Sequence, residues 1–131
     1  FQDLKELDGG SVISVLDGHG MVGLNVAQRM GRTVPKLVMK KVQEAGGSAT
    51  DSDVAGRCFK EAFKEADDNL HQSGVAEESS GATATVALVQ GKNLAVAWIG
   101  DSKAVIGGHT QGGIGQLSEF PHGIKGGVHV E

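Results

Sequence analysis

The residues best suited to chemistry follow a short apolar segment near the start of the chain. Residues 11–16 are rich in β-branched side chains and predict a buried strand, and Asp17, Gly18, His19 and Gly20 follow it directly. A carboxylate flanked by glycines, whose backbone carbonyls are accessible, suits a hard divalent cation such as Mg²⁺ or Mn²⁺. The imidazole of His19 can donate or accept a proton near neutral pH. On these residues alone, a turn followed by an exposed loop histidine is the simpler interpretation.

The same stretch also matches the pattern G-x-G-x-x-G over residues 18–23. In dinucleotide-binding proteins this pattern joins a strand to a helix whose N-terminus receives a pyrophosphate. Here Asp17 would place a carboxylate at the mouth of that anion site. Such a fold also needs a parallel strand after its first helix, whereas this sequence predicts further helices before any strand. A dinucleotide-binding oxidoreductase is therefore the third-ranked hypothesis.

Two later motifs, taken together with residues 17–20, resemble those of a known enzyme family. Residues 80–84 read Ser-Gly-Ala-Thr-Ala, and residues 99–105 read Ile-Gly-Asp-Ser-Lys-Ala-Val. In this order, with helices and a hairpin between them, the motifs resemble those of the type 2C (PPM) metal-dependent protein serine/threonine phosphatases. The resemblance spans about residues 11–106. It implies an α+β fold with two packed antiparallel β-sheets flanked by α-helices, and we expect residues 1–131 to form a single, incomplete domain of this kind.

The resemblance also implies roles for individual residues. Asp17 is similar to the aspartate that bridges two catalytic metal ions, and Gly18 to the residue whose backbone carbonyl binds one of them. His19 is similar to the general acid that protonates the leaving alkoxide, and Asp101 to an aspartate of a third, weaker metal site. The implied activity is hydrolysis of phosphoserine or phosphothreonine in a phosphoprotein substrate by a metal-activated water. The implied cofactor is Mg²⁺ or Mn²⁺, with two or three ions in a complete family member.

Two metal-binding aspartates of the family have no counterpart here. They belong to late Ser-Asp-Gly and Asp-Asn motifs, and no aspartate follows Asp101. Residues 117–119 and 126–128 resemble landmarks that the family separates by a longer segment. Two interpretations remain open: part of a longer enzyme, which we favour, or a pseudophosphatase, a catalytically inactive copy that acts as a binding or regulatory module.

The elements expected to position these motifs are helices in the first half of the chain and strands in the second. Three helices are expected, at residues 22–30, 33–45 and 51–70. The second has Thr33 as its N-cap, and the third begins near Asp51 or Ser52 and has an apolar stripe. After the strand at residues 11–16, further strands are expected at residues 82–89, 94–99, 103–106 and 116–120. A four-residue loop joins the first two of these as a hairpin. Residues 109–115 predict a loop, and residues 122–131 have no assignable structure.

Composition narrows the class of protein and of partner. The chain has 131 residues, 39% of them hydrophobic, which predicts one domain, and no run is apolar enough for a membrane span. A net charge of −4 without a long Lys/Arg cluster argues against nucleic acid as a binding partner. We expect no membrane partner, and the oligomeric state is open. A single cysteine fits an intracellular location, cytoplasmic or nuclear, although it is also consistent with a secreted fragment.

Four other side chains are expected to be structural. Cys58 lies on the apolar stripe of the third predicted helix and is interpreted as a buried thiol, not as a nucleophile. Trp98 is expected in the core. Thr83 and Thr85 alternate with apolar residues and are interpreted as the more polar face of a strand.

Overall fold

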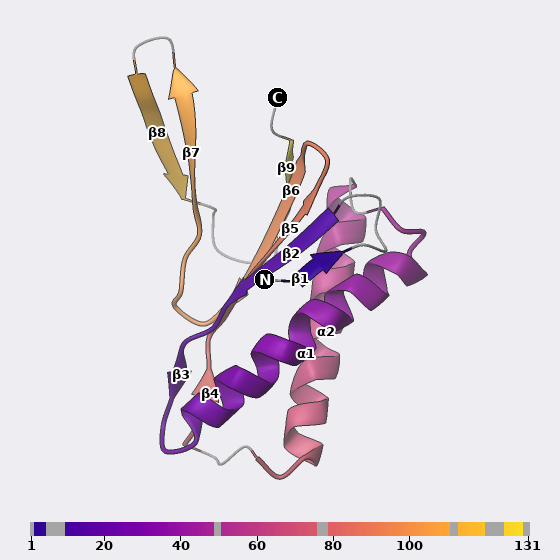
Figure 1. Ribbon diagram of the computed structural model, residues 1–131, viewed down its shortest axis with the longest axis vertical. Helices are drawn as coiled ribbons and strands as arrows, with labels where there is room; N and C mark the ends of the chain where they lie inside the picture. The colour runs from indigo at the N-terminus through magenta and orange to yellow at the C-terminus, as the bar shows by residue number, and fades with distance from the viewer. Residues whose placement is uncertain are drawn as a thin grey trace.

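A five-stranded antiparallel sheet forms the centre of the fold (Figure 1). The figure shows the computed structural model of the chain, which describes residues 2–4, 10–48, 51–75, 79–110, 113–119 and 125–129. In spatial order, the strands of this sheet are β1 (Gln2–Leu4), β2 (Gly10–Val15), β5 (Ala84–Gln90), β6 (Asn93–Ile99) and β9 (Lys125–His129). Helices α1 (Gly23–Glu44) and α2 (Ser52–Gln72) pack against each other and against one face of the sheet.

Two shorter ladders complete the described structure. β3 (Gly18–His19) pairs with β4 (Gly81–Ala82) near the start of α1. β7 (Val105–Thr110) pairs with β8 (Gly113–Glu119) in a hairpin that projects away from the main sheet (Figure 1). Every ladder in the described ranges is antiparallel. The structure therefore confirms the α+β class, with antiparallel sheets and helices packed on a sheet.

The core lies between the sheet and the two helices. Val12, Leu88 and Ala95 occupy paired positions on β2, β5 and β6, and all three are buried in the cluster that also contains the helix side chains. Because successive strand residues point to opposite faces, Ile13 and Val15 lie on the other face, where they are 38% and 68% exposed. Within the described ranges, neither helix has a stretch long and apolar enough to cross a membrane.

Helix α1 runs without a break, so the prediction of two helices, the second capped by Thr33, is wrong. Pro35 lies inside α1, where it has no amide hydrogen to donate to the carbonyl of Gly31. The Thr33 hydroxyl donates to a carbonyl one turn earlier, at 3.0 Å, and so does not cap a new helix. Val34 and Val38 are fully buried beside Pro35. Burying one valine stabilises by about 1.5–3 kcal/mol, so this face offsets a proline cost of about 3 kcal/mol.

Helix α2 confirms the sequence prediction in its start and in its buried face. The Asp51 carboxylate accepts hydrogen bonds from the amides of Asp53 at 2.9 Å and Val54 at 3.0 Å, which makes it the N-cap. The buried residues of the helix are Ala55, Cys58, Phe59, Ala62, Phe63, Ala66 and Leu70. Burial raises the pKa of the Cys58 thiol, and Glu61 raises it further. Cys58 is therefore a buried, free thiol, as expected, in a setting that disfavours the thiolate.

The β5–β6 hairpin is tighter than predicted. Gln90 pairs with Asn93, so Gly91 and Lys92 alone form the turn in place of a four-residue loop. Gly91 has a φ of 59°, a conformation that glycine adopts without a steric penalty and that two-residue hairpins need. On β6, Trp98 is 8% exposed and so is buried as expected, although it lies outside the cluster between the sheet and the helices.

The last part of the chain contains more strand than predicted. The strand expected at residues 103–106 is β7, which begins two residues later and runs to Thr110. β7 and β8 cover most of the loop expected at residues 109–115, so that prediction is wrong, and β9 lies within the unassigned residues 122–131. Glycine-rich strands lack an alternating side-chain pattern, and only their partners provide the hydrogen bonds that define them. Residues 111–112, 120–124 and 130–131 lie outside the described structure.

Candidate functional site

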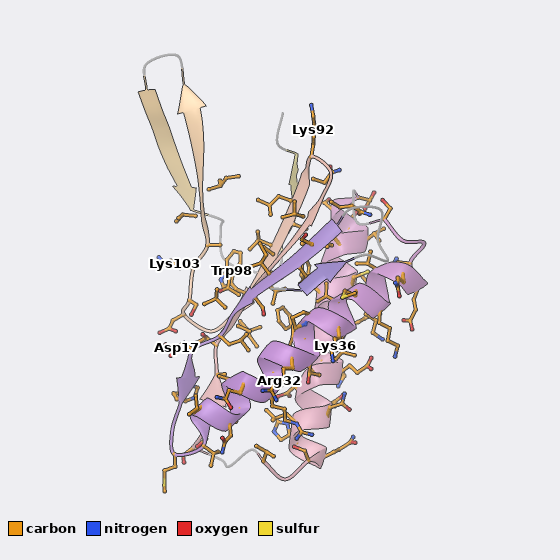
Figure 2. All side chains as sticks on the ribbon, in the orientation of Figure 1. Asp17, Arg32, Lys36, Lys92, Trp98 and Lys103 are labelled. Carbon is orange, nitrogen blue, oxygen red and sulfur yellow. The ribbon has the colours of Figure 1, made fainter. Side chains whose placement is uncertain are left out.

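Asp17 lies at the junction between β2 and β3, where it is joined to the chain before β5 (Figure 2). The Thr83 amide donates to the Asp17 carbonyl at 2.8 Å, and the Asp17 amide donates to the Thr83 hydroxyl at 3.2 Å. The pairing on either side is Val15 with Thr85 and Gly18 with Ala82. The main sheet therefore continues in register through Asp17 into the β3–β4 ladder, which fixes the backbone of Asp17 although its side chain is exposed.

The third motif also meets Thr83. The hydroxyl oxygens of Thr83 and Ser102 lie 2.8 Å apart and share a hydrogen bond. Gly100 has a φ of 87°, and a Cβ built on it would lie 2.8 Å from the Thr83 methyl carbon. The turn that carries Asp101 thus packs on Thr83. The three motifs are brought together at one threonine, and Asp101 is exposed beside Ser102.

Thr83 is the site residue that the sequence interpretation missed, because alternation alone placed it on a polar strand face. The available signal was its position in the Ser-Gly-Ala-Thr-Ala motif. Thr85, two residues later, behaves as a strand residue, and its buried hydroxyl has no hydrogen-bond partner among the described residues.

His19 lies on β3 with its imidazole against the backbone of β4. A Cβ built on Gly81 would lie 3.0 Å from both Cε1 and Nε2 of this ring, so glycine at this position leaves room for the imidazole. The ring lines a cavity of about 730 Å³ between the β3–β4 ladder and the two helices, with Met30, Phe63 and Leu70 on its apolar wall. Neither Asp17 nor Asp101 belongs to the lining of this cavity.

Close backbone contacts hold the turn from residue 18 to residue 23. A Cβ built on Gly18 would collide with the carbonyl oxygen of Gly23, the first residue of α1. Gly20 has a φ of 81°, and a Cβ built on it would collide with Ser79 and Ser80. The Ser80 hydroxyl also accepts a hydrogen bond from the Val22 amide at 3.3 Å. The glycines of the G-x-G-x-x-G pattern therefore serve close packing between β3, β4 and α1, and the antiparallel ladders favour this interpretation over a dinucleotide site.

The donors at this site are of the chemical type that a hard divalent cation prefers. Asp17 offers a carboxylate and Gly18 a backbone carbonyl on an exposed turn, and Asp101 offers a second carboxylate. In the part of the chain that the structure describes, no three His, Cys, Asp or Glu side chains are grouped so that they could hold a metal ion. These donors fit part of a coordination shell and do not complete one.

Comparison with known proteins identifies the relatives of this chain. A sequence model of the family described as "Protein phosphatase 2C" matches residues 2–122. "Probable protein phosphatase 2C 64" of Oryza sativa subsp. japonica is 33% identical over 114 residues, which are 85% of this chain and 26% of that protein. "Probable protein phosphatase 1N" of Homo sapiens is 35% identical over 98 residues, which are 75% of this chain and 22% of that protein. The chain thus spans about a quarter of the length of these relatives.

The fold is also similar to that of a solved phosphatase structure. The serine-threonine phosphatase 2C from Toxoplasma gondii superposes with a TM-score of 0.68 at 18% sequence identity, over 87% of this chain and 40% of that one. This likeness supports the α+β architecture, and the family match covers nearly the whole chain. The chain therefore belongs to the protein phosphatase 2C family.

Proposed function

We propose that this chain contributes part of the catalytic centre of a metal-dependent protein serine/threonine phosphatase. The observation that carries the proposal is the convergence of the three motifs at Thr83, which joins the backbone of Asp17 to the turn that carries Asp101. Family membership supplies the reaction class. The substrates proposed on the same ground are phosphoproteins.

In this proposal each residue has a separate task. The Asp17 carboxylate and the Gly18 carbonyl hold a divalent cation, Mg²⁺ or Mn²⁺, together with ligands from elsewhere in the protein. When bound, such ions activate water and neutralise charge on the phosphoryl group. His19, held against Gly81, donates a proton to the leaving serine or threonine oxygen. Asp101 holds a further, weaker cation on its own turn.

The test is the Asp17→Asn variant of the natural protein that contains this chain. Asparagine keeps the size of the side chain and removes the charge, so we expect turnover of a phosphoserine peptide with Mn²⁺ to fall at least 100-fold while the thermal unfolding temperature stays unchanged. Asp68→Asn is the matched control, because Asp68 is an exposed aspartate on α2 whose ion-pair partner among the described residues is Lys64, at 3.1 Å on the surface. Unchanged turnover in Asp17→Asn would remove the proposal.

A pseudophosphatase is the second candidate function. The family draws two metal ligands from late motifs that this sequence does not contain, so a natural protein without those motifs would lack part of the metal site. In that case the natural protein would bind a phosphopeptide without hydrolysing it at any Mn²⁺ concentration. Phosphate release measured beside peptide binding separates the two candidates.

The location of the protein is proposed from Cys58. A free, buried thiol is stable in a reducing compartment, which supports an intracellular location, cytoplasmic or nuclear. Fractionation of cells that express the natural protein tests it, and recovery from the secreted fraction would contradict it.

A further inference from the structure

We propose that the hydroxyl groups of Thr83 and Ser102 form a positioning link that fixes the Asp17 turn and the Asp101 turn relative to each other. The inference rests on the proposed function, in which these two turns carry the metal-binding carboxylates. It assigns a role to two side chains that bind neither cation nor substrate themselves.

The strand pairing at Asp17 contains one irregular hydrogen bond. At the hydrogen-bonded positions of an antiparallel ladder, two opposite residues exchange both backbone hydrogen bonds. The Thr83 amide donates to the Asp17 carbonyl at 2.8 Å. The Asp17 amide, however, donates to the Thr83 hydroxyl, at 3.2 Å, and not to the Thr83 carbonyl. The orientation of the Asp17 peptide therefore depends on a hydroxyl group, in a ladder that is otherwise set by backbone atoms.

The Thr83 hydroxyl forms a second hydrogen bond, to Ser102. Thr83 Oγ1 accepts from the Asp17 amide and is also hydrogen-bonded to Ser102 Oγ at 2.8 Å. A hydroxyl has one donor and two acceptor positions, so it can make both bonds at once. Asp17 and Ser102, which are far apart in the chain, are thereby joined through a single oxygen atom.

Packing against Gly100 restricts the position of the Thr83 side chain. The Thr83 methyl lies so close to Gly100 that a Cβ built there would be 2.8 Å from it. The φ of 87° at Gly100 is in the region that glycine adopts most readily. Because Thr83 and Ser102 are both partly buried, water competes weakly for their hydrogen bond. Groups that hydrogen-bond to metal-binding residues orient those residues, and their loss typically lowers metal affinity or activity about 10–100-fold.

The experiment compares four single variants of the natural protein and one double variant, Thr83→Val with Ser102→Ala. Thr83→Val keeps the branched shape and removes the hydroxyl, Ser102→Ala removes its partner, and Thr83→Ser keeps the hydroxyl without the methyl. Thr85→Val is the matched control, because it makes the same change two residues along at a hydroxyl with no partner among the described residues. The readouts are the Kd for Mn²⁺ alone by calorimetry, the thermal unfolding temperature, and hydrogen exchange at the Asp17 amide without metal.

We expect Thr83→Val to weaken Mn²⁺ binding about 10-fold or more and to speed exchange at Asp17 at least 10-fold. Ser102→Ala should give a smaller loss in the same direction, and the double variant should bind no more weakly than Thr83→Val, because both changes break one link. Thr83→Ser should stay within about threefold of the unsubstituted protein, and Thr85→Val should match it in Kd and exchange.

Two outcomes separate this inference from the proposed function. If the unsubstituted protein binds no Mn²⁺ and releases no phosphate, the proposed function fails, and the proposed positioning of metal ligands fails with it. If the unsubstituted protein binds Mn²⁺ and releases phosphate, but Thr83→Val changes only the unfolding temperature and leaves the Kd and Asp17 exchange unchanged, the positioning link alone is overturned. Should Thr83→Val not fold, Ser102→Ala and Thr83→Ser decide between the same outcomes.

Discussion

Gly18→Ala is the substitution whose effect the structure determines most directly. An alanine Cβ at this position would lie 2.5 Å from the carbonyl carbon of Gly23 and 3.2 Å from the Cβ of Ala27. Carbon atoms pack at about 3.5–4.0 Å, so β3 and the start of α1 must move apart by roughly 1 Å. The obstacle is backbone, which cannot rotate away as a flexible side chain would.

The expected cost follows from this displacement. Overpacking a well-packed site costs about 1–3 kcal/mol, and we expect the upper half of this range because the contact is with backbone atoms. Gly18 lies between Asp17 and His19 in the chain, so both move with it. A misplacement of about 1 Å can lower turnover about 100-fold, and we expect a loss of this size.

The assay is urea unfolding of the natural protein together with turnover of a phosphopeptide. Gly31→Ala is the matched control, because a Cβ there would lie at an ordinary contact distance, 3.6 Å, from Leu16 Cδ1. Gly31 lies inside α1, where replacing glycine with alanine should stabilise by about 0.5–1 kcal/mol. A Gly18→Ala variant that unfolds at the same urea concentration as the unsubstituted protein would contradict the predicted clash, and so would a shift of both variants in the same direction.

Two further predictions concern the helices. Asp51→Ala removes the cap of α2 with its bonds of 2.9 and 3.0 Å and should cost about 1 kcal/mol in urea unfolding, whereas Asp53→Ala should cost clearly less. Lys41 Nζ lies 2.8 Å from the Glu65 carboxylate, and this hydrogen bond lowers the pKa of Glu65 below its usual 4.5. The stability that the ionised Glu65 contributes to the fold is therefore present above pH 4.5 and is lost as the pH falls through the lowered pKa. The same bond raises the pKa of Lys41, whose contribution is present at neutral pH and is lost as the pH rises through the raised value. An NMR titration should show the pKa of Glu65 rising toward its usual value in Lys41→Met, although Lys40, 3.5 Å away, still lowers it. A Glu65 pKa that does not change in this variant would contradict the assignment.

The sequence predicted the elements whose signals are local. The start of α2 near Asp51 and the apolar stripe that contains Cys58 are set by residues within one or two turns of each other, and the structure confirms both. The break expected before Pro35 did not occur, because burial of a valine-rich face offset one missing hydrogen bond. The strand expected at residues 116–120 overlaps only the later part of β8. The other strand residues after Ile106 carried too little side-chain pattern to be assigned, since their pairing comes from distant or glycine-rich partners.

The sequence by itself determined which chemical groups are present and in what order: Asp17, Gly18 and His19 after a strand, then Asp101 on a later turn. Their proposed roles remain predictions. Only the tertiary structure decided that Thr83 connects these groups, through two bonds to Asp17 and one to Ser102. The physical reason is that strand register joins residues 66 positions apart, and no local pattern specifies that pairing. The side chain that alternation placed on a polar strand face became, in the folded chain, the centre of the candidate site.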